Sequence, residues 1–338
     1  MKQSRQLNIV KALCIILMVI GHCEAPAGVT GFIYLFHMPA FFFLSGFLLK
    51  EEWLDKPGAF VWKRICTLYA PYVFWELLFL LLGGLFFRLH LTDTHLTGQE
   101  MLSQAFKLVT FRGHQPLLNG YWFLKTLFFC SVGCLFLLKF IRRGRLWLVA
   151  ALLLAAGLCR LLPFETTMLS RLLMACAFYI TGFLAARRQI KLPLPYALAA
   201  LAAVAVVSLF WRQSILVDGW EVLPYYAVAL LGTYGIFGLA TALDRLDKTA
   251  RALDFIGRAT LTILTFHFLS FKLVSLLKIA IWHLPVETLA EFPVIHAHNT
   301  LFWVLYSLVG VAVPLLIFRL YERCGHPSGS RKFPVKLF

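Results

Sequence analysis

Charged side chains are scarce in this chain, since Asp, Glu, Lys and Arg make up only 14% of its 338 residues. Soluble domains carry about 25% charged residues and roughly 45–50% apolar ones. Here the hydrophobic share reaches 60%, and the mean hydropathy is +0.79. A water-soluble fold cannot cover that much apolar side chain, so the composition excludes an ordinary soluble globular protein.

Acidic residues are half as numerous as basic ones, 16 against 32, which leaves a net charge of +16. An excess of this sign is typical of nucleic-acid-binding proteins when it forms a basic stripe on a soluble module. No such module is evident, because the basic residues stand in short stretches between apolar runs. We therefore expect no nucleic-acid partner.

The sequence also lacks the paired cysteine spacing of a zinc site, so we expect no metal. Most of the eight cysteines sit inside apolar runs, where a thiol behaves as a small hydrophobic group. Cys23 and Cys159 are both expected near one membrane surface. A disulfide or two separately packed thiols would fit there, and packed thiols are the favoured alternative.

No linker, low-complexity tract or internal repeat interrupts the chain. We predict one integral-membrane domain over residues 1–323, followed by a polar cytoplasmic tail over 324–338. The sequence makes no prediction about oligomeric state.

What the sequence does contain is a series of long apolar runs, and a helix needs about 20 such residues to cross a hydrocarbon layer roughly 30 Å thick. The runs predict an all-α, polytopic membrane helix bundle of about ten transmembrane helices. The predicted spans are 7–24, 30–49, 66–89, 120–141, 145–163, 168–187, 193–211, 222–244, 256–281 and 299–321. The first run carries Lys11 and lacks a small-residue cleavage site, so it should remain as a helix.

The distribution of positive charge predicts the orientation, because cytoplasmic segments accumulate Lys and Arg. Most of the 32 basic residues fall on the side of the amino terminus, so both termini are expected in the cytoplasm, with the chain crossing the plasma membrane many times. The two longest connections, 90–119 and 282–298, then lie outside. Residues 101–109 have the spacing of an amphipathic helix, which either lies on the membrane or packs over the mouth of the bundle.

Ionisable side chains inside the predicted spans are the candidates for function, because each costs about 2.5–3.5 kcal/mol at mid-depth. Six stand out, and they come from the first, second, third, fourth and ninth spans. They are Lys11, His22, His37, Glu76, Lys125 and His267.

Lys11 and His22 share one predicted helix. Eleven steps of about 100° bring them to within roughly 20° of one face, and about 16 Å apart along the axis. A phosphopantetheine arm has a comparable length. A cation at one end would hold phosphate, while the imidazole at the other would act on an acyl group. The simpler alternatives are a lysine that snorkels to the inner headgroups and an interfacial histidine bonded to a carbonyl.

His37 is expected at the depth of His22 if the first two spans are antiparallel neighbours, and Pro39 should kink its helix. Glu76, in the middle of the third span, needs a partner. We predict that it orients His22 or His37, with an interhelical structural bond as the alternative. His267 lies at mid-depth in the ninth span and is expected in the same network.

These residues lie in segments that resemble the acyltransferase type 3 family of bacterial integral-membrane O-acyltransferases, in particular its fucose 4-O-acetylase-like branch. The first helix of that family is similar to LNIVKALCIILMVIGH, which contains Lys11 and His22 with ten positions between them. The second helix of the family resembles FHMPAFFFLSGFLL, which contains His37.

Three later segments resemble the family in the same order. They are RICTLYAPYVFW with Arg64, GYWFLKTLF with Trp122, and FIGRATLTILTFHFL with His267. The chain departs from the family pattern at four positions, where Lys11 replaces the more usual Arg, Asn8 replaces Asp, Thr260 replaces Ser and Leu264 replaces Tyr. Lys11 keeps the positive charge but loses the bidentate fork of an arginine.

The resemblance implies a cytoplasmic acyl-coenzyme A donor, usually acetyl-CoA, and a hydroxyl acceptor on a carbohydrate or glycolipid at the outer face. His22 is then the general base or the transient acyl carrier, since imidazole titrates near neutral pH. Lys11 and Arg64 would hold donor phosphates, and His37 and Glu76 would orient reacting groups.

Four residues are expected on the acceptor side: Tyr121, Trp122, Lys125 and His267. The two aromatic rings would stack on a sugar, although an aromatic side chain at a helix end also serves as a membrane-interface anchor.

A multi-helix transporter of a small polar or sugar-like solute is the alternative function, because intramembrane ionisable residues also line transport paths. Transporters commonly show inverted repeats and paired broken helices, and neither is evident. A non-catalytic scaffold would leave Lys11 and His22 unexplained.

Overall fold

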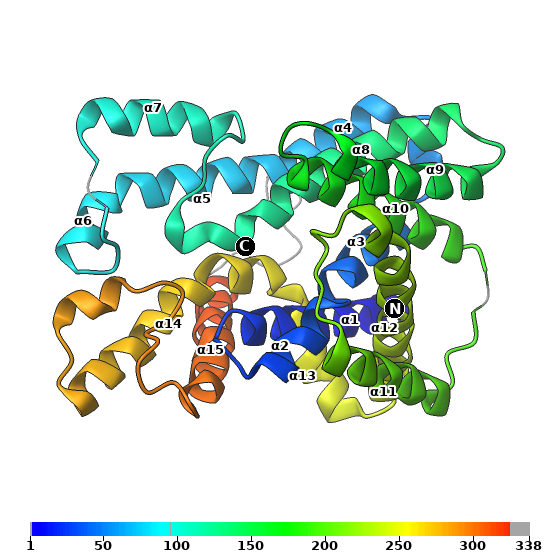
Figure 1. Cartoon of the computed structure of the whole chain (residues 1–338). Helices are drawn as coiled ribbons and strands as arrows, with labels where there is room; N and C mark the ends of the chain where they lie inside the picture. The colour runs from blue at the N-terminus through cyan, green and yellow to red at the C-terminus, as the bar shows by residue number, and fades with distance from the viewer. Residues whose placement is uncertain (1, 95, 189, 325–338) are drawn as a thin grey trace. The chain divides into compact units, whose positions relative to one another are not determined.

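The computed structural model describes residues 2–94, 96–188 and 190–324, and within these ranges the regular structure is helical with no β-strand. It begins with α1 (Lys2–Gly21) and ends with α15 (Phe302–Arg323) (Figure 1). The predicted all-α fold is confirmed. Of the predicted cytoplasmic tail, residues 325–338 lie outside the described part of the chain.

Seven helical segments among the described residues are long and apolar enough to cross a membrane. They are Ala27–Phe47, Pro57–Leu81, Pro116–Phe140, Thr167–Ala185, Gly219–Leu243, Thr260–Trp282 and Phe302–Arg323. Each overlaps a predicted span, although Pro57–Leu81 begins and ends earlier than the predicted 66–89. The other three predicted spans fall on α1, on α9 (Arg145–Leu158) and on the shorter apolar helix α11 (Leu194–Phe210). The total of ten therefore stays a prediction, as does the orientation.

The chain divides into two compact units. The first comprises Met1–Met18, Pro26–Arg64 and Thr126–Arg258. It contains most of α1 and the whole of α9 and α11. It also contains α8 (Trp122–Phe140) from Thr126 onward. Its other elements are α2 (Ala27–Tyr34), α3 (His37–Phe47), η1 (Glu51–Leu54), α4 (Pro57–Arg64), η4 (Cys159–Leu161), α10 (Thr167–Ala185), η5 (Gly219–Glu221), α12 (Val222–Leu243) and α13 (Asp247–Arg258).

Glycines allow α3 and α10 to pack closely in this unit. A Cβ on Gly46 would lie 1.8 Å from the carbonyl oxygen of Tyr179, and one on Gly182 would lie 1.9 Å from that of Phe43. Small residues are the usual means of close helix contact in membranes. The backbone break between α2 and α3, at Phe36, comes three residues before Pro39. A proline in the first turn of a helix lacks only an N–H that has no partner there, so the helix restarts at His37.

Polar bonds fasten α1 within the first unit. Arg5 Nε donates to Asp244 Oδ1 at 2.5 Å, and Asn8 Nδ2 donates to Asp254 Oδ1 at 2.8 Å. The carbonyl of Asn8 also lies against Gly257, where a Cβ would be 2.0 Å from its oxygen. The helix that carries Lys11 is therefore held in a defined register on α12 and α13.

The second unit comprises Val19–Ala25, Ile65–Lys125 and Ala259–Phe338. It contains η2 (Ile65–Tyr69), α5 (Ala70–Leu81), α6 (Gly83–Arg88), α7 (Gly98–Val109), η3 (Pro116–Tyr121), the first residues of α8, α14 (Thr260–Trp282), η6 (Val286–Ala290) and α15. Helix α14 packs along α15, α7 packs on α5, and η3 packs on α14.

Helix α7 confirms the predicted amphipathic helix. It begins with a capping box in which Thr97 and Glu100 bond each other's backbone N–H groups. Leu102 and Phe106 are exposed on one side, whereas Leu108 is fully buried. An exposed apolar stripe of this kind suits a membrane surface.

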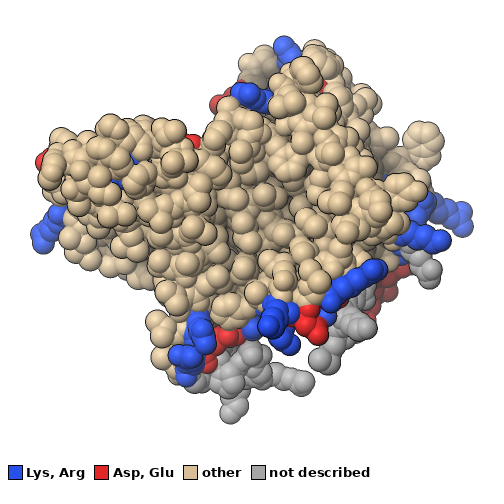
Figure 2. Space-filling model, turned by 90° about the horizontal axis from the view of Figure 1, so that it is seen from below, with Lys and Arg blue, Asp and Glu red and all other residues tan. Residues whose placement is uncertain are grey.

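The outer surface carries little charge. In Figure 2 most of the visible surface is neither basic nor acidic, and the Lys and Arg side chains gather near its margins. Many large apolar side chains are exposed, including Phe210, Trp147 and Leu301. Exposed apolar surface on this scale fits a protein whose solvent is lipid.

All eight cysteines lie in the described residues and carry free thiols, so Cys23 and Cys159 are two buried thiols. The sulfurs of Cys130, Cys134 and Cys176 lie within 4.8 Å of one another. Cys134 Sγ donates to the carbonyl of Cys176 at 3.7 Å, as a protonated thiol does. This group packs as small apolar side chains between α8 and α10.

Candidate functional site

The second unit brings two of the predicted site residues together. His22 directly follows α1, and its N–H bonds to the carbonyl of Val19 as the helix tightens at its end. His267 lies in α14 and is fully buried. Nδ1 of His22 is 3.1 Å from Nε2 of His267, a hydrogen-bond distance. Two segments separated by more than 240 residues in sequence thus form an imidazole pair.

The surroundings of His267 determine which nitrogen donates. Its Nδ1 lies 3.1 Å from the carbonyl oxygen of Ile263 and 3.0 Å from that of Leu264. Carbonyls only accept, so Nδ1 of His267 carries the hydrogen and its Nε2 accepts in the neutral ring. Nδ1 of His22 must then donate. The lone pair of His22 is left on Nε2, which makes no hydrogen bond with any described residue.

Aromatic packing fixes the planes of both rings. The rings of His22 and His267 stack with centroids 5.3 Å apart and an interplanar angle of 18°. Phe268 stacks on His22 at 5.0 Å and contacts His267 at 3.9 Å. His22 is only half-buried whereas His267 is fully buried, so the accessible part of the pair belongs to His22.

Glu76 makes a different contact from the predicted one. Its Oε2 accepts the backbone N–H of Gln115 at 2.8 Å, while Oε1 has no hydrogen-bond partner among the described residues. Glu76 is fully buried in α5. In this structure its carboxylate holds the loop between α7 and η3, and the acceptor for His22 is another imidazole.

Lys125 and Tyr72 hold the same loop. Nζ of Lys125 donates to the carbonyl of Gly113 at 3.0 Å and to that of Phe111 at 3.4 Å. The hydroxyl of Tyr72 donates to the carbonyl of Leu108 at 3.2 Å. Because loop carbonyls bind the half-buried ammonium group of Lys125, this lysine shapes the walls around the site.

The short helix η3 connects this loop to the histidine pair. Tyr121 is fully buried, and its hydroxyl bonds Thr265 at 2.7 Å. Trp122 is half-buried at the start of α8. A Cβ on Gly120 would lie 3.0 Å from Leu264 Cδ1 and 3.6 Å from His267 Cε1. Glycine at this position therefore allows η3 to approach His267.

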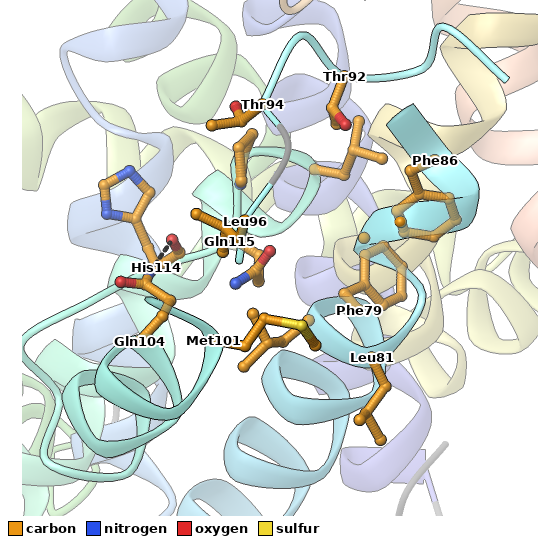
Figure 3. Close-up of a pocket in the computed structure, with 15 residues that line it drawn as sticks. Phe79, Leu81, Phe86, Thr92, Thr94, Leu96, Met101, Gln104, His114 and Gln115 are labelled. Carbon is orange, nitrogen blue, oxygen red and sulfur yellow. Dashed lines mark hydrogen bonds between the residues drawn. The ribbon is translucent and has the colours of Figure 1, made fainter. Parts of the chain in front are cut away.

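A cavity of about 400 Å³ opens beside the same loop (Figure 3). Phe79 and Phe86 form an apolar wall, and Gln104 and His114 supply polar groups. The cavity is also lined by Leu80, Leu81, Gly83, Gly84, Thr92, Thr94, Leu96, Met101, Gln115, Pro116 and Leu117. Its size lies in the range of small-molecule sites, about 300–1,000 Å³.

His114 brings an imidazole to this cavity. Burial lowers the pKa of His114, and the nearby charge of Lys125 lowers it further. Its backbone carbonyl accepts a hydrogen bond from Gln104 at 3.3 Å (Figure 3). Sequence reasoning missed His114, because a single histidine in a loop carries no periodic signal.

The remaining predicted residues, Lys11, His37 and Arg64, lie in the first unit. Nδ1 of His37 donates to the carbonyl of Ile33 at 2.8 Å, so a neutral His37 also carries its lone pair on Nε2. Arg64 donates to the hydroxyl of Tyr179 at 3.4 Å. Lys11 is half-buried on α1.

The model of the Acyltransferase domain family matches residues 4–319, nearly the whole chain. The chain belongs to the acyltransferase type 3 family. Comparisons with curated proteins and with solved structures gave no match. The match identifies a membrane protein of an acyltransferase family and does not favour the transporter alternative. An acyltransferase in the membrane implies an acyl donor, an acceptor and a surrounding bilayer.

The histidine pair has a geometry that suits acyl transfer. An imidazole nitrogen with a free lone pair, whose opposite nitrogen is held in one protonation state, can act as a general base or as a nucleophile. Helical periodicity in the sequence indicates which face of a helix a residue occupies, but it does not indicate which helices contact each other. The pairing of His22 with His267 can therefore be seen only in the folded chain.

Proposed function

We propose that this acyltransferase is an O-acetyltransferase of the fucose 4-O-acetylase-like branch, and that it moves an acetyl group from cytoplasmic acetyl-CoA to a hydroxyl of a cell-surface carbohydrate or glycolipid. The observation that carries the proposal is the free Nε2 of His22, with Nδ1 bonded to His267 at 3.1 Å. The enzyme spans the plasma membrane with both termini in the cytoplasm, as the basic residues indicate.

In the direct reaction, Nε2 of His22 takes the proton of the acceptor hydroxyl. The hydroxyl oxygen attacks the thioester carbonyl carbon and forms the new C–O bond, and the C–S bond breaks. The thiolate leaves and receives the proton from His22, so coenzyme A departs as the thiol. His267 accepts the Nδ1 hydrogen of His22 throughout, which stabilises the imidazolium that forms in between.

The two-step alternative uses the same nitrogen as a nucleophile. Nε2 of His22 attacks the thioester, an acyl-histidine forms, and the thiolate departs. The acceptor oxygen then attacks the acyl carbon and forms the C–O bond, and the C–N bond to Nε2 of His22 breaks. The hydroxyl proton passes through solvent to the coenzyme A thiolate, and His267 returns to Nδ1 of His22 the proton that it took up when the acyl-histidine formed. In this route His267 takes up the positive charge, because its Nδ1–H already faces two carbonyl oxygens.

The other predicted residues take supporting roles in the proposal. Lys11 and Arg64 bind donor phosphates, and His37 is a second imidazole that orients a reacting group. Glu76 and Lys125 are positioning residues, because both bond to the loop that lines the cavity.

The cavity of about 400 Å³ takes the acceptor. Its apolar wall suits the face of a sugar ring or the start of a lipid tail, while Gln104 and His114 bind hydroxyl groups. Trp122 offers a half-buried aromatic face, and Tyr121 positions η3 beside His267.

The test is acyl transfer by the purified full chain in lipid nanodiscs. We expect release of coenzyme A from radiolabelled acetyl-CoA, with label transferred to a cell-surface carbohydrate fraction. His22→Ala should abolish release and transfer while the protein keeps its thermal unfolding temperature. His90→Asn is the matched control, since His90 is exposed in a loop at φ 54°, a conformation that asparagine tolerates.

Unchanged turnover in His22→Ala would overturn the catalytic role of that residue. Uptake of a labelled sugar into proteoliposomes, with no thioester consumed, would overturn acyl transfer altogether.

A further inference from the structure

Four arginines line one basin in the first unit. None of them has a role in the proposed function. The basin has a volume of about 660 Å³ and is lined by Arg142, Arg145, Arg187 and Arg188, which we call the arginine basin. The rest of its lining is Gly144, Leu146, Trp147, Thr181, Leu184, Ala185 and Ile190, with no acidic residue among them. Arg142 lies in the loop before α9, Arg145 is the first residue of α9, and Arg187 and Arg188 follow the end of α10.

Two of the arginines are held in place by one carboxylate. Glu51 Oε1 lies 3.2 Å from Arg145 Nη1, and Glu51 Oε2 lies 3.1 Å from Arg187 Nη2. Phe183 packs beneath both guanidinium groups, 5.2 Å from that of Arg145 and 3.7 Å from that of Arg187. Asp55 pairs with Arg142 at 3.1 Å. Guanidinium groups that are already held in place bind a phosphate with a smaller loss of side-chain conformational entropy.

The balance of charge favours an anion. Glu51 and Asp55 offset two of the four positive charges, and the guanidinium group of Arg188 makes no ion pair or hydrogen bond with any described residue. Nε of Arg145 is buried and has no hydrogen-bond partner in the part of the chain that the structure describes. The basin further contains the start of α9, where Gly144 is the N-cap at φ 72° and no side chain caps the helix. A helix amino terminus adds partial positive charge to a site that already contains guanidinium groups.

Trp147 gives the basin an aromatic wall. It lines the basin, yet its side chain is 80% exposed. An indole beside clustered guanidinium groups is suited to a ligand that combines a planar base with phosphates, because a base gains stacking energy on an aromatic face. A simple phosphate ion would make no use of this wall.

A second, largely apolar cavity of about 490 Å³ continues from the basin, and the two share Thr181, Ala185, Arg188 and Ile190. Its lining also includes Leu7 of α1. Lys11 follows Leu7 by four residues, one helical turn along the same face of α1. The two cavities therefore adjoin within one compact unit, and a residue one turn from the predicted phosphate-binding lysine lines the second of them.

From this geometry we infer that the arginine basin binds the adenosine 3′,5′-bisphosphate end of the acyl-CoA donor. Arg142, Arg145 and Arg188 contact the phosphates, and adenine stacks on Trp147. The pantetheine arm then enters the neighbouring cavity. The inference rests on the proposed function for its ligand, and it adds a binding site separate from Lys11 and Arg64.

The same phosphate chemistry could come from an anionic lipid headgroup, so the experiment separates the two sources. The probe is adenosine 3′,5′-bisphosphate, titrated calorimetrically into the full chain in nanodiscs of phosphatidylcholine. Arg188→Gln is the test variant, because it removes a charge from the basin without breaking an ion pair. Arg143→Gln is the control. Like Arg188, Arg143 is exposed, but it lies outside the lining, although its sequence neighbours Arg142 and Gly144 belong to it.

We expect Arg188→Gln to weaken binding of the bisphosphate by about tenfold, as loss of one charge-assisted hydrogen bond does. Arg143→Gln should stay within about twofold of the unmodified chain. Trp147→Leu should weaken binding by at least about fivefold. Trp62→Leu is its control, since Trp62 is also exposed and lies outside the basin.

Equal affinities in Arg188→Gln and Arg143→Gln would overturn the site while leaving acyl transfer untouched. Absence of bisphosphate binding, together with Arg188-dependent retention of phosphatidylglycerol in native mass spectrometry, would overturn it in favour of a lipid headgroup. Arg188-dependent binding in a chain that transfers no acyl group would support the site and overturn the proposed function instead.

Discussion

His22 donates from Nδ1 to Nε2 of His267 at 3.1 Å, and His267 is itself bonded at Nδ1 by two carbonyls of its own helix. In many hydrolases a carboxylate orients the catalytic imidazole. In the proposed mechanism a neutral ring performs that task, which suits a site inside a membrane, where a buried carboxylate is costly. The proposal therefore makes His267 a positioning residue whose effect can be measured.

Replacing His267 tests that role. His267→Phe removes the acceptor for Nδ1 of His22, so the proton of His22 is no longer confined to one nitrogen. We expect turnover to fall by about 100-fold to 10,000-fold. His267→Gln keeps an acceptor oxygen and should retain more activity, with a shifted pH profile of turnover. Wild-type rates in His267→Phe, with an unchanged pH profile, would contradict the positioning role.

Glu76 should act through the loop rather than through the chemistry. Glu76→Gln keeps an oxygen that can accept the N–H of Gln115, so most of the turnover should remain. Glu76→Leu leaves that buried N–H without a partner and should destabilise the fold by about 1–3 kcal/mol. Thermal unfolding and the KM for the acceptor measure the two effects. Loss of turnover in Glu76→Gln at normal stability would assign the carboxylate to the reaction.

Close packing of α3 on α10 predicts a strong effect at Gly182. A methyl group at Gly182 would lie 1.9 Å from the carbonyl oxygen of Phe43, so Gly182→Ala must push the helices apart. We expect a loss of about 3 kcal/mol or more and a clearly lower unfolding temperature. Gly133→Ala is the control, because nothing lies within 4 Å of the added methyl group. A Gly182→Ala protein as stable as Gly133→Ala would show that the two helices tolerate separation.

Acid should weaken the first unit through Glu51. Hydrogen bonds from Arg187 and then Arg145 lower the pKa of Glu51 below its usual value. A depressed pKa stabilises the fold fully above the pKa of the unfolded glutamate, about 4.3, and this stabilisation is lost as the pH falls through the folded pKa. The unfolding temperature should be measured between pH 3 and 7 for the unmodified chain and for Glu51→Gln. At the acid end it should drop less steeply in Glu51→Gln than in the unmodified chain. Parallel curves for the two proteins would contradict the Glu51 pairing.

Much of the architecture could be predicted from the sequence because its causes are local. Long apolar runs require spanning helices whatever their neighbours, and seven of the predicted spans are helices of the required length and hydropathy. Pro39 likewise marked the break before α3, since a proline lacks a donor wherever the chain goes. The motif around His22 indicated the family, and the match over residues 4–319 shows it.

The sequence by itself determined which side chains are too costly to bury without a purpose, among them His22, Glu76 and His267. Only the tertiary structure decided their partners. Glu76 bonds a loop, His22 bonds His267, and Arg142, Arg145, Arg187 and Arg188 surround one basin. Burial cost depends on the residue and its depth, and both can be read along the chain. Pairing depends on which helices meet and at what register, and that is set by contacts such as Gly46 and Gly182 between segments far apart in sequence.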